Sequence, residues 1–103
     1  MAWYAEYVER HASDGDEARL VSMYTFDAPW TSWEMHPRGA EVVICTEGEM
    51  IALQEIDGAV VRTRLGPGEY LINPPGVWHT ADVETSATAI FITAGVGTEH
   101  RPR

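Results

Sequence analysis

Four side chains in this sequence are of types that could bind a metal ion or move protons. Three of them, Glu34, His36 and Glu41, lie within the stretch WEMHPRGAE, directly before an apolar β-branched run. Burying charged groups is costly unless they are paired or bound to a cation, so their place at the edge of a predicted core indicates a site. The fourth, His79, follows the turn PPG at 74–76, whose rigidity would hold the imidazole at a fixed angle.

Strand geometry allows these residues to converge. Side chains alternate faces along an extended strand, so Glu34 and His36 point the same way. Pro37 and Gly39 interrupt that strand, which lets Glu41 return to the face of His36 despite its odd offset. Two imidazoles with carboxylates suit a divalent metal of borderline preference, such as iron, manganese, zinc, nickel or cobalt.

The elements that would position these residues are short strands. Segments rich in β-branched or aromatic residues, separated by glycine and proline, occur at 20–26, 41–46, 50–56, 59–65, 69–73, 78–83 and 88–94. Asp57-Gly58 between two of them predicts a hairpin. Strands at this spacing predict an all-β antiparallel sandwich or barrel, over roughly residues 20–95 of one 103-residue domain.

The two ends of the chain depart from this pattern. Residues 3–12 predict a short helix, which the sequence SDGD at 13–16 ends. The closing GVGTEHRPR predicts a tail or a short edge segment, for which a partner subunit is one packing surface. His100 lies in this segment, outside any motif, and we expect it to be exposed.

Composition argues against several classes of protein. A net charge of −9, from 16 acidic and 7 basic residues, disfavours nucleic-acid binding because phosphate would be repelled. No stretch approaches the roughly 18 apolar residues of a membrane helix, and the N-terminus does not resemble a secretory signal. The single cysteine, Cys45, lies in an apolar run and is expected to be a small buried hydrophobe. The expected location is the cytoplasm.

The spacing of the four residues resembles the two motifs of the cupin superfamily, G-x5-H-x-H-x3-4-E-x6-G and G-x5-P-x-G-x2-H-x3-N. His36, Glu41 and Gly48 reproduce the first motif from its second histidine onward. The segment Gly68–His79 reproduces the second motif through its histidine. Both motifs occur in order over about half of the chain, with a short spacer between them, so the match is specific.

The resemblance implies a double-stranded β-helix, or jelly roll, with one divalent metal ion near the wider end of the barrel. In the family, three histidines and one glutamate bind the metal. Carried over by position, His36, Glu41 and His79 are the second histidine, the glutamate and the last histidine. The alternative without a metal is a barrel whose mouth holds only hydrogen-bonded polar side chains.

Three positions depart from the family pattern. Thr25 replaces the glycine that opens the first motif and Val83 replaces the asparagine that ends the second, which concerns turns and barrel shape. Glu34 stands in place of the first histidine. Its carboxylate could be a fourth ligand that neutralises a divalent ion, or it could orient substrate or act as a catalytic base beside a three-ligand centre. A third alternative is a solvated carboxylate at the barrel mouth. The sequence leaves these alternatives open.

The resemblance implies a metal-dependent enzyme acting on a small molecule, of the dioxygenase or the isomerase or lyase type. One alternative is a module that binds a metal or small ligand without turnover, and another is a barrel that only dimerises. A homodimer is expected, because small barrels leave an exposed sheet edge. Trp30, Trp33 and Trp78 flank the ligand strands, where they could seal the barrel or an interface, or form an aromatic platform for a ligand.

Overall fold

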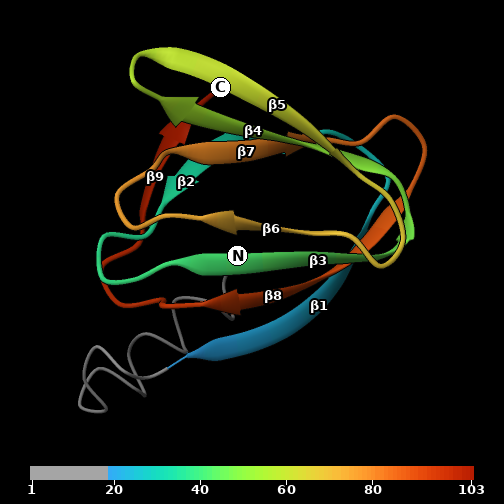
Figure 1. Ribbon diagram of the computed structural model, residues 1–103, viewed down its shortest axis with the longest axis horizontal. Helices are drawn as coiled ribbons and strands as arrows, with labels where there is room; N and C mark the ends of the chain where they lie inside the picture. Colours follow the sequence, from blue (N-terminus) through green and yellow to red (C-terminus); the bar gives the residue numbers. More distant parts are fainter. Residues whose placement is uncertain (1–18) are drawn as a thin grey trace.

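A computed structural model describes residues 19–103 of the chain. Over this range a pair of antiparallel sheets face each other, as the sequence predicts (Figure 1). The strands are β1 Leu20–Phe26, β2 Ser32–Met35, β3 Glu41–Gly48, β4 Met50–Ile56, β5 Ala59–Leu65, β6 Tyr70–Asn73, β7 His79–Asp82, β8 Ala87–Thr93 and β9 Glu99–Pro102. The strand orders are β1-β8-β3-β6 and β5-β4-β7-β2-β9. None of the described residues belongs to a helix with the length and apolar character needed to cross a bilayer.

Alternation along the strands builds the core between the sheets. On β8, Ala87, Ala89 and Phe91 are buried, whereas Ile90 and Ile92 on the opposite face are partly exposed. The buried apolar cluster consists of Val43, Cys45, Met50, Leu65, Ala81, Val83, Ala87, Ala89 and Phe91. Its cysteine is a buried free thiol, as predicted.

The β4–β5 hairpin confirms the prediction made from Asp57-Gly58. These residues have φ values of 52° and 80°, and Ile56 pairs with Ala59 across the turn. Positive φ at both central residues is what a two-residue type I′ turn requires, and its twist matches that of the strands. The hairpin therefore fixes the register between β4 and β5, and β4 pairs with β7 on its other side.

The two ends of the chain have different outcomes. The helix predicted for residues 3–12 lies outside the described residues. The C-terminal segment forms β9, an edge strand of the five-stranded sheet that pairs with β2 of the same chain, so the sheet extends beyond residue 95.

A stacked arginine holds β9 against the sheet. The Arg101 guanidinium lies 4.6 Å from the centre of the Trp78 ring and 5.3 Å from that of Trp33, and it forms an ion pair with Glu55. A planar guanidinium close to two indole rings gains cation–π attraction that a lysine ammonium reproduces poorly. Arg101 thus joins β9 to β2, β4 and the segment that leads into β7.

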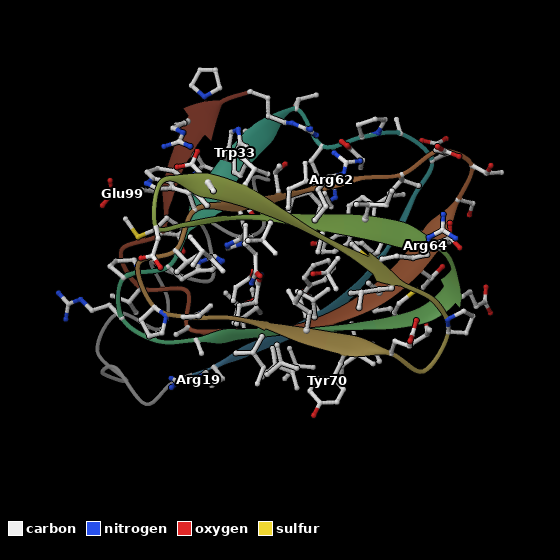
Figure 2. The ribbon with its side chains drawn as sticks, turned by 45° about the horizontal axis from the view of Figure 1, so that its top comes forward. Arg19, Trp33, Arg62, Arg64, Tyr70 and Glu99 are labelled. Atoms are coloured by element: carbon white, nitrogen blue, oxygen red, sulfur yellow. The ribbon has the colours of Figure 1, made fainter. Side chains whose placement is uncertain are left out.

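We predict that Arg101→Lys lowers the free energy of unfolding by about 1 kcal/mol, because the stack is lost while the charge is kept. Urea unfolding followed by tryptophan fluorescence measures this change. Arg62→Lys is the matched control, since Arg62 is exposed on β5 (Figure 2) and its replacement should have little effect. Equal stability of the two variants would contradict the proposed role of the stack.

Candidate metal centre

The candidate site lies between the sheets, at the end where the β2–β3 and β6–β7 turns come together (left in Figure 1). Glu34 on β2 pairs in register with His79, the first residue of β7. Glu41 is the first residue of β3 in the other sheet. The backbone N–H of Gly76 donates to the carbonyl of His36 at 3.0 Å, which ties the turn before His79 to the residue that follows β2.

His36, Glu41 and His79 meet in the interior, where none of them is more than 3% exposed. Nε2 of His36 lies 3.2 Å from Oε2 of Glu41, and Nε2 of His79 lies 3.1 Å from Oε1. The two ring centres are 5.0 Å apart. One carboxylate therefore spans two imidazoles and presents one oxygen to each.

Hydrogen bonds on the far side of each ring determine the tautomers. Nδ1 of His79 lies 3.2 Å from the carbonyl oxygen of Val77, which can only accept, so Nδ1 carries the proton. Nδ1 of His36 lies 2.8 Å from Oγ1 of Thr98, which donates its own proton to the carbonyl of Gly95. In the neutral state both Nε2 atoms therefore direct lone pairs at the carboxylate, as metal-binding histidines do.

The electrostatics of the cluster favour a positive charge between these groups. Burial raises the pKa of Glu41, but contacts with His36 and His79 outweigh burial and hold that pKa well below its ordinary value. For His79, burial lowers the pKa and the Glu41 carboxylate raises it, with a net rise. Nε2 of His79 is buried and makes no aligned hydrogen bond despite its short distance to Glu41. A proton or a metal cation would satisfy both partners.

Further donors anchor the Glu41 carboxylate. Nδ2 of Asn73 donates to Oε1 at 3.1 Å and Oγ1 of Thr93 donates to Oε2 at 2.7 Å. Nε2 of Gln54 in turn donates to Oδ1 of Asn73 at 2.8 Å. These three residues were not predicted from the sequence. Gln54 and Thr93 occupy inward positions of otherwise apolar strands, and this alternation could have identified them, whereas Asn73 offered no comparable signal.

Glu34 lies beside the cluster. Glu34, His36 and His79 each offer a ligand atom, and these atoms lie within 4.8 Å of one another, so the group could hold a metal ion. The Glu34 side chain is 12% exposed, and Nε2 of His100 lies 3.1 Å from its Oε1. His100 is half-exposed, as expected, but it was not predicted to contact the site. Its position depends on the pairing of β9 with β2, which places it opposite Glu34.

A pocket of about 410 Å³ opens next to Glu34 and Glu41. Its walls come from β1, the β1–β2 loop, β2, the start of β3, β8 and β9. The lining includes Tyr24, Phe26, Trp30 and Phe91 as aromatic residues and Asp27, Glu34, Glu41 and His100 as titratable ones. Of the three tryptophans singled out from the sequence, Trp30 lines this pocket, while Trp33 and Trp78 stack on Arg101.

Comparison with known families decides the classification. The Cupin domain family matches residues 25–95, more than half of the chain. The chain belongs to the cupin family. Comparison with curated proteins finds no match.

Solved structures similar to this cupin share its fold at low sequence identity. An oxalate oxidase is 17% identical, with a TM-score of 0.65 over 78% of this chain and 44% of its own. A cupin-2 domain protein from Shewanella frigidimarina is 21% identical, with a TM-score of 0.63 over 84% and 72%. Hydroquinone 1,2-dioxygenase from Sphingomonas, with 4-hydroxybenzoate bound, is 14% identical, with a TM-score of 0.61 over 75% and 60%. This cupin spans less than half the length of the oxalate oxidase chain.

The structure explains the residues at two positions of the family pattern, the glycine kept at 48 and the valine found at 83. Gly48 has a φ of 71°, and a Cβ at this position would lie 2.1 Å from the backbone oxygen of Ser86, so a larger residue would collide with the neighbouring backbone. Val83, which replaces the last asparagine, is 1% exposed and belongs to the apolar core. The valine at this position therefore contributes apolar packing where the family pattern has a polar asparagine.

We predict that Thr93→Val destabilises the metal-free protein by about 1–3 kcal/mol, because a buried ionised oxygen of Glu41 loses its donor. The measurement is urea unfolding at neutral pH in EDTA. Thr25→Val is the matched control, since Thr25 is exposed and its hydroxyl bonds the Thr88 hydroxyl at the surface, so its effect should stay within about 0.5 kcal/mol. If Thr93→Val were as stable as the wild type, the buried carboxylate would not depend on this bond.

Proposed function

We propose that this cupin holds one divalent metal ion between His36, Glu41 and His79, with Glu34 beside them as a fourth ligand or a proton carrier. The observation that carries the proposal is the pair of imidazole nitrogens that face a buried carboxylate from two sides. The hydrogen bonds at Nδ1 leave the Nε2 lone pairs of both rings directed at the Glu41 carboxylate. This arrangement is stable only when a positive charge lies between the nitrogens and the carboxylate. Nitrogen and oxygen donors in this ratio fit iron, manganese, zinc or nickel.

The two carboxylates differ in ways that suggest different roles. Glu41 is buried, held ionised by its neighbours and anchored by Asn73 and Thr93, so it suits a permanent ligand. Glu34 lines the pocket and has His100 as its partner, so it suits a group that takes a proton from a bound molecule and returns it.

This division of roles supports a metal-dependent enzyme acting on a small metabolite, of the dioxygenase or the isomerase or lyase type. When bound, the metal ion would supply Lewis-acid or redox chemistry at the inner end of the pocket. The aromatic walls would hold the substrate and limit access of water, and Glu34 would handle the proton. Binding without turnover is the alternative outcome.

The test is elemental analysis of protein purified without a nickel column. We expect about one metal ion per chain in the wild type and none in His79→Gln, which keeps a polar side chain of similar size but loses the imidazole. His100→Gln is the control and should keep its metal, because His100 contacts only Glu34 among the four site residues. Metal retained in His79→Gln, or absent from wild type incubated with each ion in turn, would refute the site.

The same experiment on Glu34→Gln separates the two roles of Glu34. Loss of metal would make Glu34 a ligand, and retention would leave a three-ligand centre with Glu34 free to carry a proton beside it. Thermal shift with candidate metabolites then identifies compounds that bind. Measuring whether each such compound is consumed distinguishes turnover from binding alone, since a binding module would be stabilised without consuming it.

A further inference from the structure

We propose that the pocket selects an uncharged ligand with an aromatic or similarly planar apolar body and a hydroxyl group, such as a phenol, and rejects small carboxylate anions. The preference for a neutral ligand rests on the proposed metal site in the metal-loaded protein, and on the carboxylates that line the pocket in the metal-free protein. The preference for a planar apolar body rests on the pocket walls alone.

The walls of the pocket are a packed set of aromatic rings. The ring centres of Phe26 and Trp30 are 5.5 Å apart, those of Trp30 and Phe91 are 5.8 Å apart, and Phe26 meets Phe91 edge to face at 6.0 Å. Tyr24 extends the cluster at 6.0 Å from Phe26. Tilted and edge-on contacts at these distances are favourable and hold each ring in place. Such a wall offers a flat apolar ligand a ready surface.

The volume of the pocket suits one ring with substituents. About 410 Å³ is available, and a cavity of roughly 150 Å³ suffices for benzene. A two-carbon dianion would leave most of this space, and most of the aromatic surface, without a partner. Size therefore favours the larger apolar ligand.

The charges around the pocket disfavour an anion. Asp27, Glu34 and Glu41 line it, and no lysine or arginine is among the described residues that do. A divalent metal ion would be neutralised by two ligating carboxylates, which leaves no net positive charge to attract an anionic substrate. His100, which also lines the pocket, already contacts Glu34. A neutral hydroxyl, by contrast, can donate to the Glu34 carboxylate.

Three arginines that could have bound an anion form ion pairs outside the pocket. Arg101 pairs with Glu55, Arg103 pairs with Asp82, and Arg64 pairs with Glu49. None of these three lines the pocket. The selectivity thus comes from where the chain puts its few basic residues.

Three probes separate the contribution of the ring from that of the charge: 4-methylphenol, benzoate and oxalate. Dissociation constants come from calorimetry, for manganese-loaded and for metal-free protein. We expect 4-methylphenol to bind at least about tenfold more tightly than either anion in both states. Oxalate or benzoate binding as tightly as 4-methylphenol would overturn the inference.

Two variants sharpen the test. Thr31→Arg adds a cation at an exposed position of the pocket rim. It should raise the affinity for benzoate and so reduce the difference in affinity between 4-methylphenol and benzoate. Phe26→Leu removes one ring of the wall while keeping an apolar side chain, and should weaken 4-methylphenol binding severalfold. Unchanged affinities in both variants would place the probe outside this pocket and overturn the inference. If the chain binds none of the metal ions offered but still prefers 4-methylphenol, the metal site is refuted and the ligand class stands.

Discussion

The structure depends on one buried carboxylate. Glu41 sits between two imidazoles that come from the other sheet or the turn beside it, and takes hydrogen bonds from neighbouring strands of its own sheet. A charge removed from water is tolerated only when every oxygen is satisfied, so each of these contacts is a condition for burying it. Because the partners come from both sheets, the same cluster sets how the sheets approach each other at this end.

Much of this arrangement could be predicted from the sequence because it follows from local rules. Runs of β-branched and aromatic residues between glycine and proline indicated the strands at 20–26, 50–56 and 59–65 with their observed bounds, and Asp57-Gly58 indicated the hairpin. The resemblance to the cupin motifs brought His36 and Glu41 into one group with the distant His79. These features depend on residue composition, turn chemistry and motif spacing, which can be recognised without knowing which strands become neighbours.

The remainder depends on tertiary pairing, which the sequence does not show. His100 contacts Glu34 only because β9 pairs with β2, and Asn73 reaches Glu41 only because β6 pairs with β3. The pocket walls combine residues from β1, β8 and the loop before β2, so their aromatic character could not be assembled from any one segment. Trp33 and Trp78, which flank the ligand residues in sequence, stack on Arg101 instead of lining the pocket.

The central claim is that two imidazoles and the glutamates meet around one cation, and X-ray absorption spectroscopy of the manganese- or zinc-loaded protein tests it most directly. The account predicts a nitrogen and oxygen shell with the multiple-scattering signature of two imidazoles per metal. His36→Gln and His79→Gln should each reduce that signature, or abolish binding. A shell of oxygen alone in the wild type, with no imidazole scattering, would contradict the account.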